Sequence, residues 1–227
     1  MINQLHARLH RPEQGWDPIA DAYAHRYAQT EWHKLDLERV QRIEQWIGGF
    51  EGRRVLDLGS GPGQYAVAFA QRGAQVTCHD VSANYLAYLQ RKAGELGVTD
   101  RLSCSLGYLD EAPRMLRTSF DLVFNRVCWY YGFGDRSFAK VVFSLISPGG
   151  YGYVDTPHMA FNRAQHGWSS RARMWLNHRL AIKIGHPFPP HGRLAKLFAG
   201  YPIDSMLVDY STPDHDRIWL RKATNAP

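Results

Sequence analysis

The stretch Val55-Leu56-Asp57-Leu58-Gly59-Ser60-Gly61-Pro62-Gly63 decides the fold of this 227-residue chain. Its apolar start predicts a short buried strand, and residues 64–72 beyond the last glycine indicate a helix. Glycines at such a turn let the backbone approach a ligand closely. The next predicted strand leads to Asp80, 21 residues beyond Gly59. An acid about 20 residues beyond the first glycine can accept hydrogen bonds from ribose hydroxyls, so we expect a ligand here rather than a plain tight turn.

Strands and helices alternate on both sides of this stretch. Gly73, Gly97 and Ser82 mark helix ends and one helix start. Strands separated by helices of this length favour a mainly parallel sheet with helices on both faces. The predicted strands are Arg54–Leu58, Gln75–Val81, Arg101–Leu106, Phe120–Asn125 and Tyr151–Thr156. The predicted helices are Asp17–Gln29, Asp36–Ile47, Gln64–Arg72, Asn84–Leu96 and Asp135–Ile146.

The rhythm changes after Thr156. Residues 158–190 form an insertion with a predicted helix near Ser170–Ile184, and a second helix follows at about His191–Ala199. Two strands, Ile203–Tyr210 and Asp216–Arg221, are joined by five residues, so the last strand should run antiparallel to its neighbour.

We expect a single domain over residues 1–227, because this length suits one core. Within it we expect an N-terminal helical lid over residues 1–50 and an insertion at 158–190 between strands five and six. A hydrophobic content of 44% excludes a disordered chain. No apolar run approaches the ~18 residues of a membrane span, and no secretory signal begins the chain, so we expect a cytoplasmic protein without a membrane partner. The three cysteines are lone and widely spaced, which suits buried thiols.

The net charge of +6 is concentrated in one segment. Residues 1–157 have equal numbers of acidic and basic side chains, whereas residues 158–200, called the basic segment below, have seven basic ones and no acid. We predict that residues 158–190 form a basic cap that selects an anionic small molecule. Docking to nucleic acid is a disfavoured rival, and a solvated basic face is the alternative without function. The seven side chains are Arg163, Arg171, Arg173, Arg179, Lys183, Arg193 and Lys196.

The glycines distinguish two cofactor classes. The dinucleotide pattern G-x-G-x-x-G would require a third glycine where Gln64 stands, and the pattern here is G-x-G-x-G. Asp57 lies two residues before the first glycine, where it would disfavour a pyrophosphate and suit a cation. S-adenosylmethionine has an ammonium and a sulfonium and no phosphate, so we favour it over a nicotinamide cofactor.

With these motifs the sequence resembles the class I S-adenosylmethionine-dependent methyltransferases of the small-molecule type. Val55–Gly63 matches the first motif of that family, Asp121–Tyr130 the fourth, and Ile146–Gly150 its L-x-P-G-G turn before strand five. Trp16–Tyr23 resembles the lid helix Y-D-x-x-A-x-x-Y of small-molecule members. The resemblance implies a Rossmann-like, doubly wound sheet of seven strands.

The resemblance also implies a set of cofactor contacts. Asp80 would bind the ribose, and Val81 would line the adenine. Many members have an acid in the adenine loop, where Tyr108 and Leu109 stand here. The implied cofactor residues are Tyr23, Tyr27, Asp57, Gly59, Ser60, Gly61, Gly63, Asp80, Val81, Tyr108, Leu109, Asn125, Arg126 and Val127. For Tyr23 and Tyr27 helix packing is an equal alternative.

Methyl transfer from a sulfonium is an in-line displacement, so the acceptor must be held on the side opposite sulfur with water excluded. Candidate groups follow strands four and five. We predict His158 as the general base and Tyr130 as a second catalytic residue, with a solvated loop histidine and a core aromatic as the respective alternatives. The predicted substrate contacts are Trp129, Tyr131, Arg171 and Trp175, of which Trp129 is as easily a core residue.

No clustered acids indicate a catalytic metal, so we expect none. The sequence N-R-V-C-W-Y after strand four lacks the N/D-P-P-Y/F motif, which argues against methylation of base amines or glutamine. We therefore expect a methyltransferase with a small-molecule, anionic acceptor. An RNA-directed enzyme, a nicotinamide-dependent oxidoreductase and a non-catalytic cofactor-binding subunit remain as alternatives. The acceptor atom and the oligomeric state stay open, since one fold serves many acceptors.

Overall fold

A computed structural model describes residues 2–158, 167–180 and 183–225. Seven strands of the described chain form one sheet in the order β3-β2-β1-β4-β5-β7-β6. β1 pairs in parallel with β2 and β4, β2 pairs in parallel with β3, and β7 runs antiparallel to both β5 and β6. The predicted Rossmann-like, mainly parallel sheet with an antiparallel last strand is therefore confirmed. The strands are β1 Arg54–Leu58, β2 Gln75–Asp80, β3 Leu102–Leu106, β4 Phe120–Arg126, β5 Ile146–Pro157, β6 Ile203–Asp209 and β7 His215–Lys222.

Side-chain caps begin two of the helices. Asp36 accepts a hydrogen bond from the amide of Arg39, and Ser82, the predicted cap, accepts one from the amide of Tyr85. The α-helices are α1 Ile2–Leu9, α2 Asp21–His33, α3 Leu37–Ile47, α4 Gln64–Ala70, α5 Ala83–Glu95, α6 Ala112–Leu116, α7 Asp135–Leu145, α8 Trp168–Leu180 and α9 Arg193–Phe198. Short 3-10 turns are Pro12–Gln14, Thr99–Arg101, Leu109–Glu111 and Trp129–Tyr131.

The chain divides into two compact units, each with its own core. The first unit, Arg11–Phe124, centres on Phe50, Phe69 and Phe124, whose rings lie about 5 Å apart. The second unit, residues 1–10 and 125–227, buries Trp129 against Phe138 and Phe198. The predicted single domain over residues 1–227, with its lid and its insertion, stays a prediction.

Three predicted boundaries were wrong by four residues or more. The helix expected to end at Gln29 continues to His33. The helix expected from Asp17 begins four residues later, because the Asp17 carboxylate accepts hydrogen bonds from Ile19, Ser82 and Asn84 and so lies outside the helix. The turn expected over Ile146–Gly150 belongs to β5, since Ile146 leaves α7 in an extended conformation. The two short helices α1 and α6 were not predicted. The helix expected to end at Ile184 is described to Leu180, and residues 181–182 lie outside the described residues.

Candidate cofactor site and His–Asp cluster

The glycine loop, residues 59–63, follows β1 and needs its glycines for two different reasons. Gly59, Gly61 and Gly63 all have left-handed φ angles, +83°, +52° and +79°. A Cβ on Gly63 would lie 1.5 Å from Cδ1 of Leu89, so this end of the loop is closely packed on α5. A Cβ on Gly61 would meet nothing within 4 Å. The loop is therefore packed at Gly63 and open at Gly61, where a ligand can approach the backbone.

Asp80 holds the glycine loop to the start of α5. Its Oδ2 accepts a hydrogen bond of 2.8 Å from the Gly61 amide, and its Oδ1 accepts one of 2.9 Å from the Ser82 amide. Burial raises the pKa of the Asp80 carboxyl, and the backbone donors oppose that rise. The acid predicted to bind ribose thus also fixes the loop on which the ligand would lie.

The polar groups around the loop fit S-adenosylmethionine. Ser60 Oγ and Gln64 Oε1 are buried without a hydrogen-bond partner in the described part of the chain, which leaves them for a ligand. Asp57 is 3% exposed, so two buried carboxyl groups, its own and that of Asp80, lie near the loop. Acidic groups suit the ammonium of this cofactor and a ribose, and they disfavour a pyrophosphate.

His79 is a residue of this site that the sequence analysis missed. Its carbonyl accepts hydrogen bonds from the amides of Gly59 and Ser60, at 2.8 and 3.3 Å. Its ring donates from Nε2 to the carbonyl of Tyr108 at 3.0 Å and accepts at Nδ1 from the Ser105 hydroxyl at 3.0 Å. Burial lowers the pKa of His79, so the neutral imidazole is favoured. One histidine inside a strand gives no sequence signal for this role.

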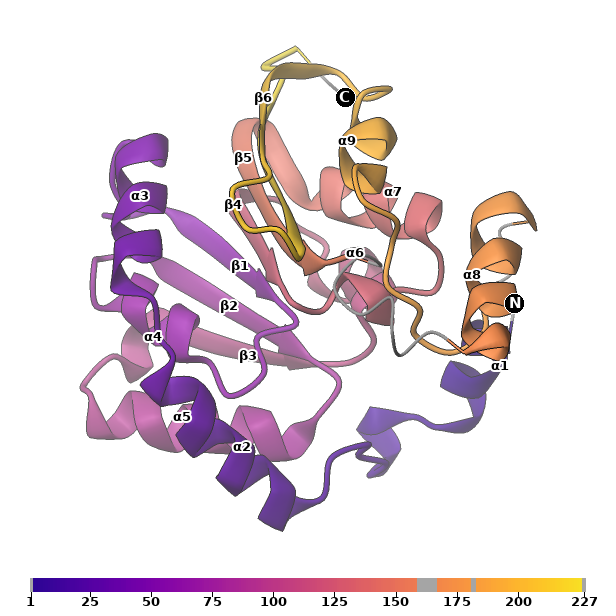
Figure 1. Ribbon diagram of the computed structural model, residues 1–227. Coiled ribbons are helices and arrows are strands. Elements are labelled where there is room, and N and C mark those ends of the chain that lie inside the picture. The colour runs from indigo at the N-terminus through magenta and orange to yellow at the C-terminus, as the bar shows by residue number, and fades with distance from the viewer. Residues whose placement is uncertain (1, 159–166, 181–182, 226–227) are drawn as a thin grey trace. The chain divides into compact units, whose positions relative to one another are not determined.

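Asp17 is a second residue whose role was missed. Its Oδ2 accepts hydrogen bonds from the Ser82 hydroxyl at 3.1 Å and the Asn84 amide at 2.9 Å. The lid motif is thereby tied to the first turn of α5, and Figure 1 shows α2 alongside α5. Trp16, its neighbour, stacks on Tyr108 with 6.1 Å between ring centroids. Asp17 lies in the motif we quoted for the lid, so the signal was present.

The tyrosines predicted to contact the cofactor, Tyr23, Tyr27 and Tyr108, lie on the first unit together with the glycine loop. Tyr27 packs on Tyr85 of α5, and Tyr23 stacks on Tyr27 and is 48% exposed. Burial raises the pKa of Tyr108 to about 12, and Leu109 beside it is buried. Val81 is half-buried between Asp80 and Ser82. Their contacts with a cofactor stay predictions.

On the second unit, β4 ends with Asn125 and Arg126, and the turn that follows is strained at Val127. Val127 has a left-handed φ of +56°, which costs about 1–3 kcal/mol for a residue with a branched Cβ. Its amide donates to the carbonyl of Asp155 at 2.7 Å. Asn125 is fully buried and donates to Cys128 Sγ at 2.9 Å. Such strain is common where a binding turn is held in place. The contacts of these residues with a cofactor stay a prediction.

The three aromatic residues that follow this turn, Trp129, Tyr130 and Tyr131, differ in how deeply they are buried. Trp129 is fully buried between Phe138 and Phe198, so the structure favours the alternative of a core aromatic. Tyr130 packs on Phe188 with 4.8 Å between centroids, and Tyr131 is 50% exposed. Of these three aromatic residues, Tyr130 and Tyr131 remain as candidates for contact with an acceptor.

The basic segment is not one uniform charged face. Lys183, 1% exposed, lies 3.8 Å from a carboxylate oxygen of the buried Asp135, and Arg193 lies 3.9 Å from its other oxygen. The expectation of seven charges on one cap is wrong for these two, because a buried carboxylate needs counter-charges. Arg171 and Trp175 are exposed on α8, so they are accessible to a ligand as the cap hypothesis requires. Arg163 lies outside the described residues.

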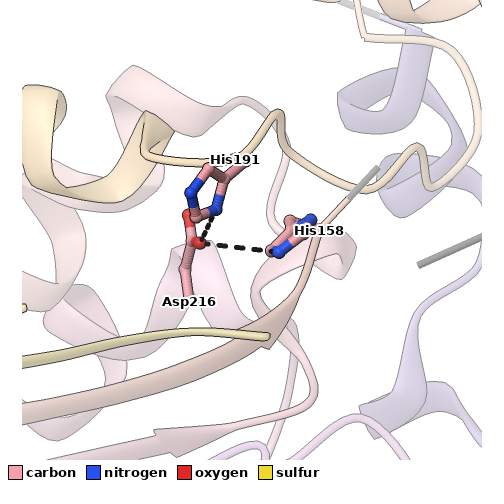
Figure 2. A group of neighbouring side chains, drawn as sticks. All are labelled: His158, His191 and Asp216. Atoms are coloured by element: carbon pink, nitrogen blue, oxygen red, sulfur yellow. Dashed lines mark hydrogen bonds and ion pairs between the residues drawn. The ribbon is translucent and has the colours of Figure 1, made fainter. Parts of the chain in front are cut away.

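His158, the predicted base, belongs to a group that we call the His–Asp cluster, made of His158, His191 and Asp216 (Figure 2). The Oδ1 of Asp216 lies 2.8 Å from His191 Nδ1 and 3.9 Å from His158 Nε2. Its Oδ2 accepts a hydrogen bond of 2.7 Å from the Gly192 amide. Burial lowers the pKa of His158, whose side chain is 2% exposed. The structure overturns the alternative of a solvated loop histidine for His158.

A second buried acid, Asp155, has different partners. Its Oδ1 lies 2.6 Å from Nδ1 of His215, and its Oδ2 lies 3.5 Å from Arg217 and 3.9 Å from Arg126. Arg126 thus faces a carboxylate of its own unit. Its predicted contact with the methionine moiety stays a prediction.

Residues 55–150 match the family model described as a methyltransferase domain. With the glycine loop, Asp80 and the seven-stranded sheet, this match decides the family. These residues form a class I S-adenosylmethionine-dependent methyltransferase domain. The methyltransferase domain spans β1 through the first part of β5, and the cofactor of its family is S-adenosylmethionine, as predicted.

The curated relatives of the methyltransferase domain differ in what they act on. A ubiquinone biosynthesis O-methyltransferase of Alkalilimnicola ehrlichii is 36% identical over 83 residues, which cover 37% of this chain and 31% of the relative. A tRNA 5-carboxymethoxyuridine methyltransferase of Escherichia coli is 28% identical over 141 residues, 61% of this chain and 54% of the relative. The chain thus spans less than two thirds of the length of these relatives.

Solved structures support the fold. An O-methyltransferase family protein from Burkholderia thailandensis superposes with a TM-score of 0.58 at 18% identity, covering 82% of this chain and 56% of the other. A S-adenosylmethionine-dependent methyltransferase from Aquifex aeolicus gives 0.57 at 14% identity, covering 85% and 97%. No helix in the described part of the chain is long and apolar enough to cross a membrane.

Proposed function

We propose that this protein transfers a methyl group from S-adenosylmethionine to an anionic small-molecule acceptor. The proposal rests on the position of Asp80, whose carboxylate accepts hydrogen bonds from the Gly61 amide in the open glycine loop and from the Ser82 amide at the start of α5. The family of the methyltransferase domain supports the same cofactor, as does Ser60 Oγ, which has no hydrogen-bond partner among the described residues.

When bound, the cofactor supplies an electrophilic methyl on a sulfonium. The residues of this chain have three tasks around it. Asp80 accepts hydrogen bonds from the ribose hydroxyls. The bare backbone at Gly61 permits close approach, and the buried Asp57 adds negative charge for the ammonium. Tyr23 and Tyr27 of the lid exclude water.

For the acceptor we propose contacts from Tyr130 and Tyr131 after β4 and from Arg171 and Trp175 on α8. Arg171 and Trp175 are exposed, so they are available to a ligand. A guanidinium pairs bidentately with a carboxylate or a phosphate, which makes an anionic acceptor the best match.

Calorimetry of the full chain with S-adenosylhomocysteine and NADH tests the cofactor. We expect one site for S-adenosylhomocysteine and no response to NADH. Asp80→Asn should weaken binding by about tenfold or more, since a hydrogen bond to a charged group is removed. Asp100→Asn, a change of an exposed acid, is the matched control and should leave binding unchanged.

Ser60→Ala covers the outcome in which Asp80→Asn fails to fold. Ser60 Oγ has no hydrogen-bond partner in the described chain. Its removal should therefore leave the free energy of unfolding unchanged and weaken the binding of S-adenosylhomocysteine. Binding of NADH with no response to S-adenosylhomocysteine would overturn the proposal in favour of the oxidoreductase alternative.

An RNA acceptor is the second candidate, favoured by the similarity to a tRNA methyltransferase of Escherichia coli. The exposed arginines Arg171, Arg173 and Arg179 on α8 would contact phosphates. Methylation of bulk tRNA with a steep loss of binding as salt increases would support it. Activity on extracted small acids but not on tRNA would exclude it.

We also propose a reducing, cytoplasmic location. All three cysteines are free thiols, and Cys78 and Cys128 are buried. Free buried thiols are typical of reducing compartments. Fractionation of cells that produce the protein tests this directly.

A further inference from the structure

Asp216 is a buried acid whose charged neighbours in the described part of the chain are imidazoles rather than arginines. Its side chain is 0% exposed, and no lysine or arginine described here lies within 4 Å of it. Asp155, the comparable buried acid, has both Arg126 and Arg217. A buried carboxylate requires a compensating charge.

We propose that His158, His191 and Asp216 bind a divalent transition-metal ion of the zinc type. Three donor atoms, His158 Nε2, His191 Nδ1 and Asp216 Oδ1, point toward one another in Figure 2. The ligand atoms of the three residues lie within 4.8 Å of one another. Imidazole nitrogen and carboxylate oxygen are ordinary zinc ligands.

The separations match a small coordination sphere. Zinc bonds of about 2.0–2.2 Å in a tetrahedral arrangement place the ligand atoms roughly 3.3 Å apart. The separations from Asp216 Oδ1, 2.8 Å to His191 and 3.9 Å to His158, lie on either side of that value. The remaining separation, between the two imidazole nitrogens, is at most 4.8 Å. Side-chain shifts of up to about 1.5 Å therefore bring all three atoms to the spacing of a tetrahedral ion.

Surrounding contacts fix the ligands in this orientation. The Gly192 amide holds Oδ2 of Asp216 and so turns Oδ1 toward the two rings. The backbone amide of His158 donates to the carbonyl of Asp214, and Tyr210 packs on His191 with 4.5 Å between centroids. Asp214 adds a buried carboxylate oxygen without a hydrogen-bond partner in the described part, and its charge acts on His158. Such supporting contacts are typical of metal sites.

Three protein ligands leave one position of a tetrahedral ion open. The side chain of His191 is 55% exposed, so solvent or a small ligand reaches this position. Open three-ligand sites hold water or an anionic oxygen, whereas structural zinc sites have four protein ligands. His158 would then use its Nε2 lone pair for the ion, and this role replaces the general base predicted for it.

Equilibrium dialysis of the chelator-treated full chain against zinc tests the site. We expect about one ion per chain in the wild type, with affinity reduced at least about tenfold in His191→Ala. His191→Cys should restore binding, because a thiolate is also a zinc ligand. His215→Gln is the matched control, since His215 also lies against a buried carboxylate but outside the cluster, and it should bind as the wild type does.

The variants separate this site from other zinc sites. Cys78 and Cys104 face each other on β2 and β3 and offer a second place for zinc. Zinc binding that persists unchanged in His191→Ala, or no binding by the wild type, overturns the proposal. S-adenosylhomocysteine binding is measured on the same samples, so a failed metal site and a failed cofactor site give different results.

Discussion

The glycine loop and the His–Asp cluster are both built around a buried carboxylate, and they are built in opposite ways. Asp80 accepts hydrogen bonds from two backbone amides, that of Gly61 in the glycine loop and that of Ser82 two residues further along the chain. Asp216 accepts from one backbone amide, that of Gly192, while its other oxygen faces the side chains of His158 and His191. The loop therefore depends on backbone conformation, whereas the cluster depends on the identity of its side chains.

The largest effect should come from a single methyl in the loop. Gly63→Ala places a Cβ 1.5 Å from Leu89 in a left-handed residue, so strain and overpacking together should destabilise the fold by about 3 kcal/mol. Gly61→Ala meets open space and should cost about 1 kcal/mol. Urea unfolding of both variants measures the difference. Equal losses would show that backbone conformation, and not packing on α5, limits the loop.

The next effect distinguishes the two buried acids of the second unit. Asp155→Asn removes the buried carboxylate charge that faces Arg126 and Arg217, although Arg217 keeps Asp209, so we expect a loss of about 3 kcal/mol. Asp216→Asn removes a carboxylate whose charged neighbours among the described residues are the imidazoles of His158 and His191. In metal-free protein we expect this change to lower the free energy of unfolding by about 1 kcal/mol. Chemical unfolding in the presence of a chelator measures both. A larger loss for Asp216→Asn would mean that its histidines are charged in the fold.

The pH dependence of stability tests His79. Its pKa is lowered by burial, so between about pH 6.5 and the lower folded value the unfolded chain binds more protons. The contribution of the neutral ring is complete above about pH 6.5 and is lost as pH falls through this window. His79→Gln keeps a donor for Tyr108 and should flatten the decline of stability between about pH 7 and pH 5.

His158 and His186, whose pKa values burial also lowers, stay in the variant, so a reduced slope is expected rather than none. An unchanged slope would show that His79 is protonated in the fold. Thermal unfolding at several pH values gives this slope.

The smallest effect on stability is expected on α8. Replacing the exposed Arg171, Arg173 and Arg179 by glutamine should change the free energy of unfolding by less than about 0.5 kcal/mol each. Affinity for an anionic acceptor should nevertheless decrease. The cap hypothesis fails if acceptor affinity in the triple variant equals that of the wild type.

The contrast between contacts near in sequence and contacts between distant segments also explains which features could be predicted from the sequence. The strand Arg54–Leu58 was predicted with the bounds that the structure gives, and the cap at Ser82 was confirmed, because both follow from residues near one another in the chain. His79 and Asp216 were missed, since their roles depend on contacts across strands. The start of α2 was misplaced for the same reason, as Asp17 bonds to α5 instead of entering the helix. Lys183 looked like a surface charge until the structure placed it beside Asp135.

The turn at Val127 has a consequence for the order of folding events. Its left-handed backbone is strained by itself, and its amide donates a hydrogen bond to the carbonyl of Asp155, 28 residues further along the chain. A strained backbone that is held by a distant hydrogen bond is stabilised late, because the intervening loop must close before that bond can form. We therefore expect Val127 to become ordered after the folding transition state. Substitutions there would change the unfolding rate far more than the folding rate.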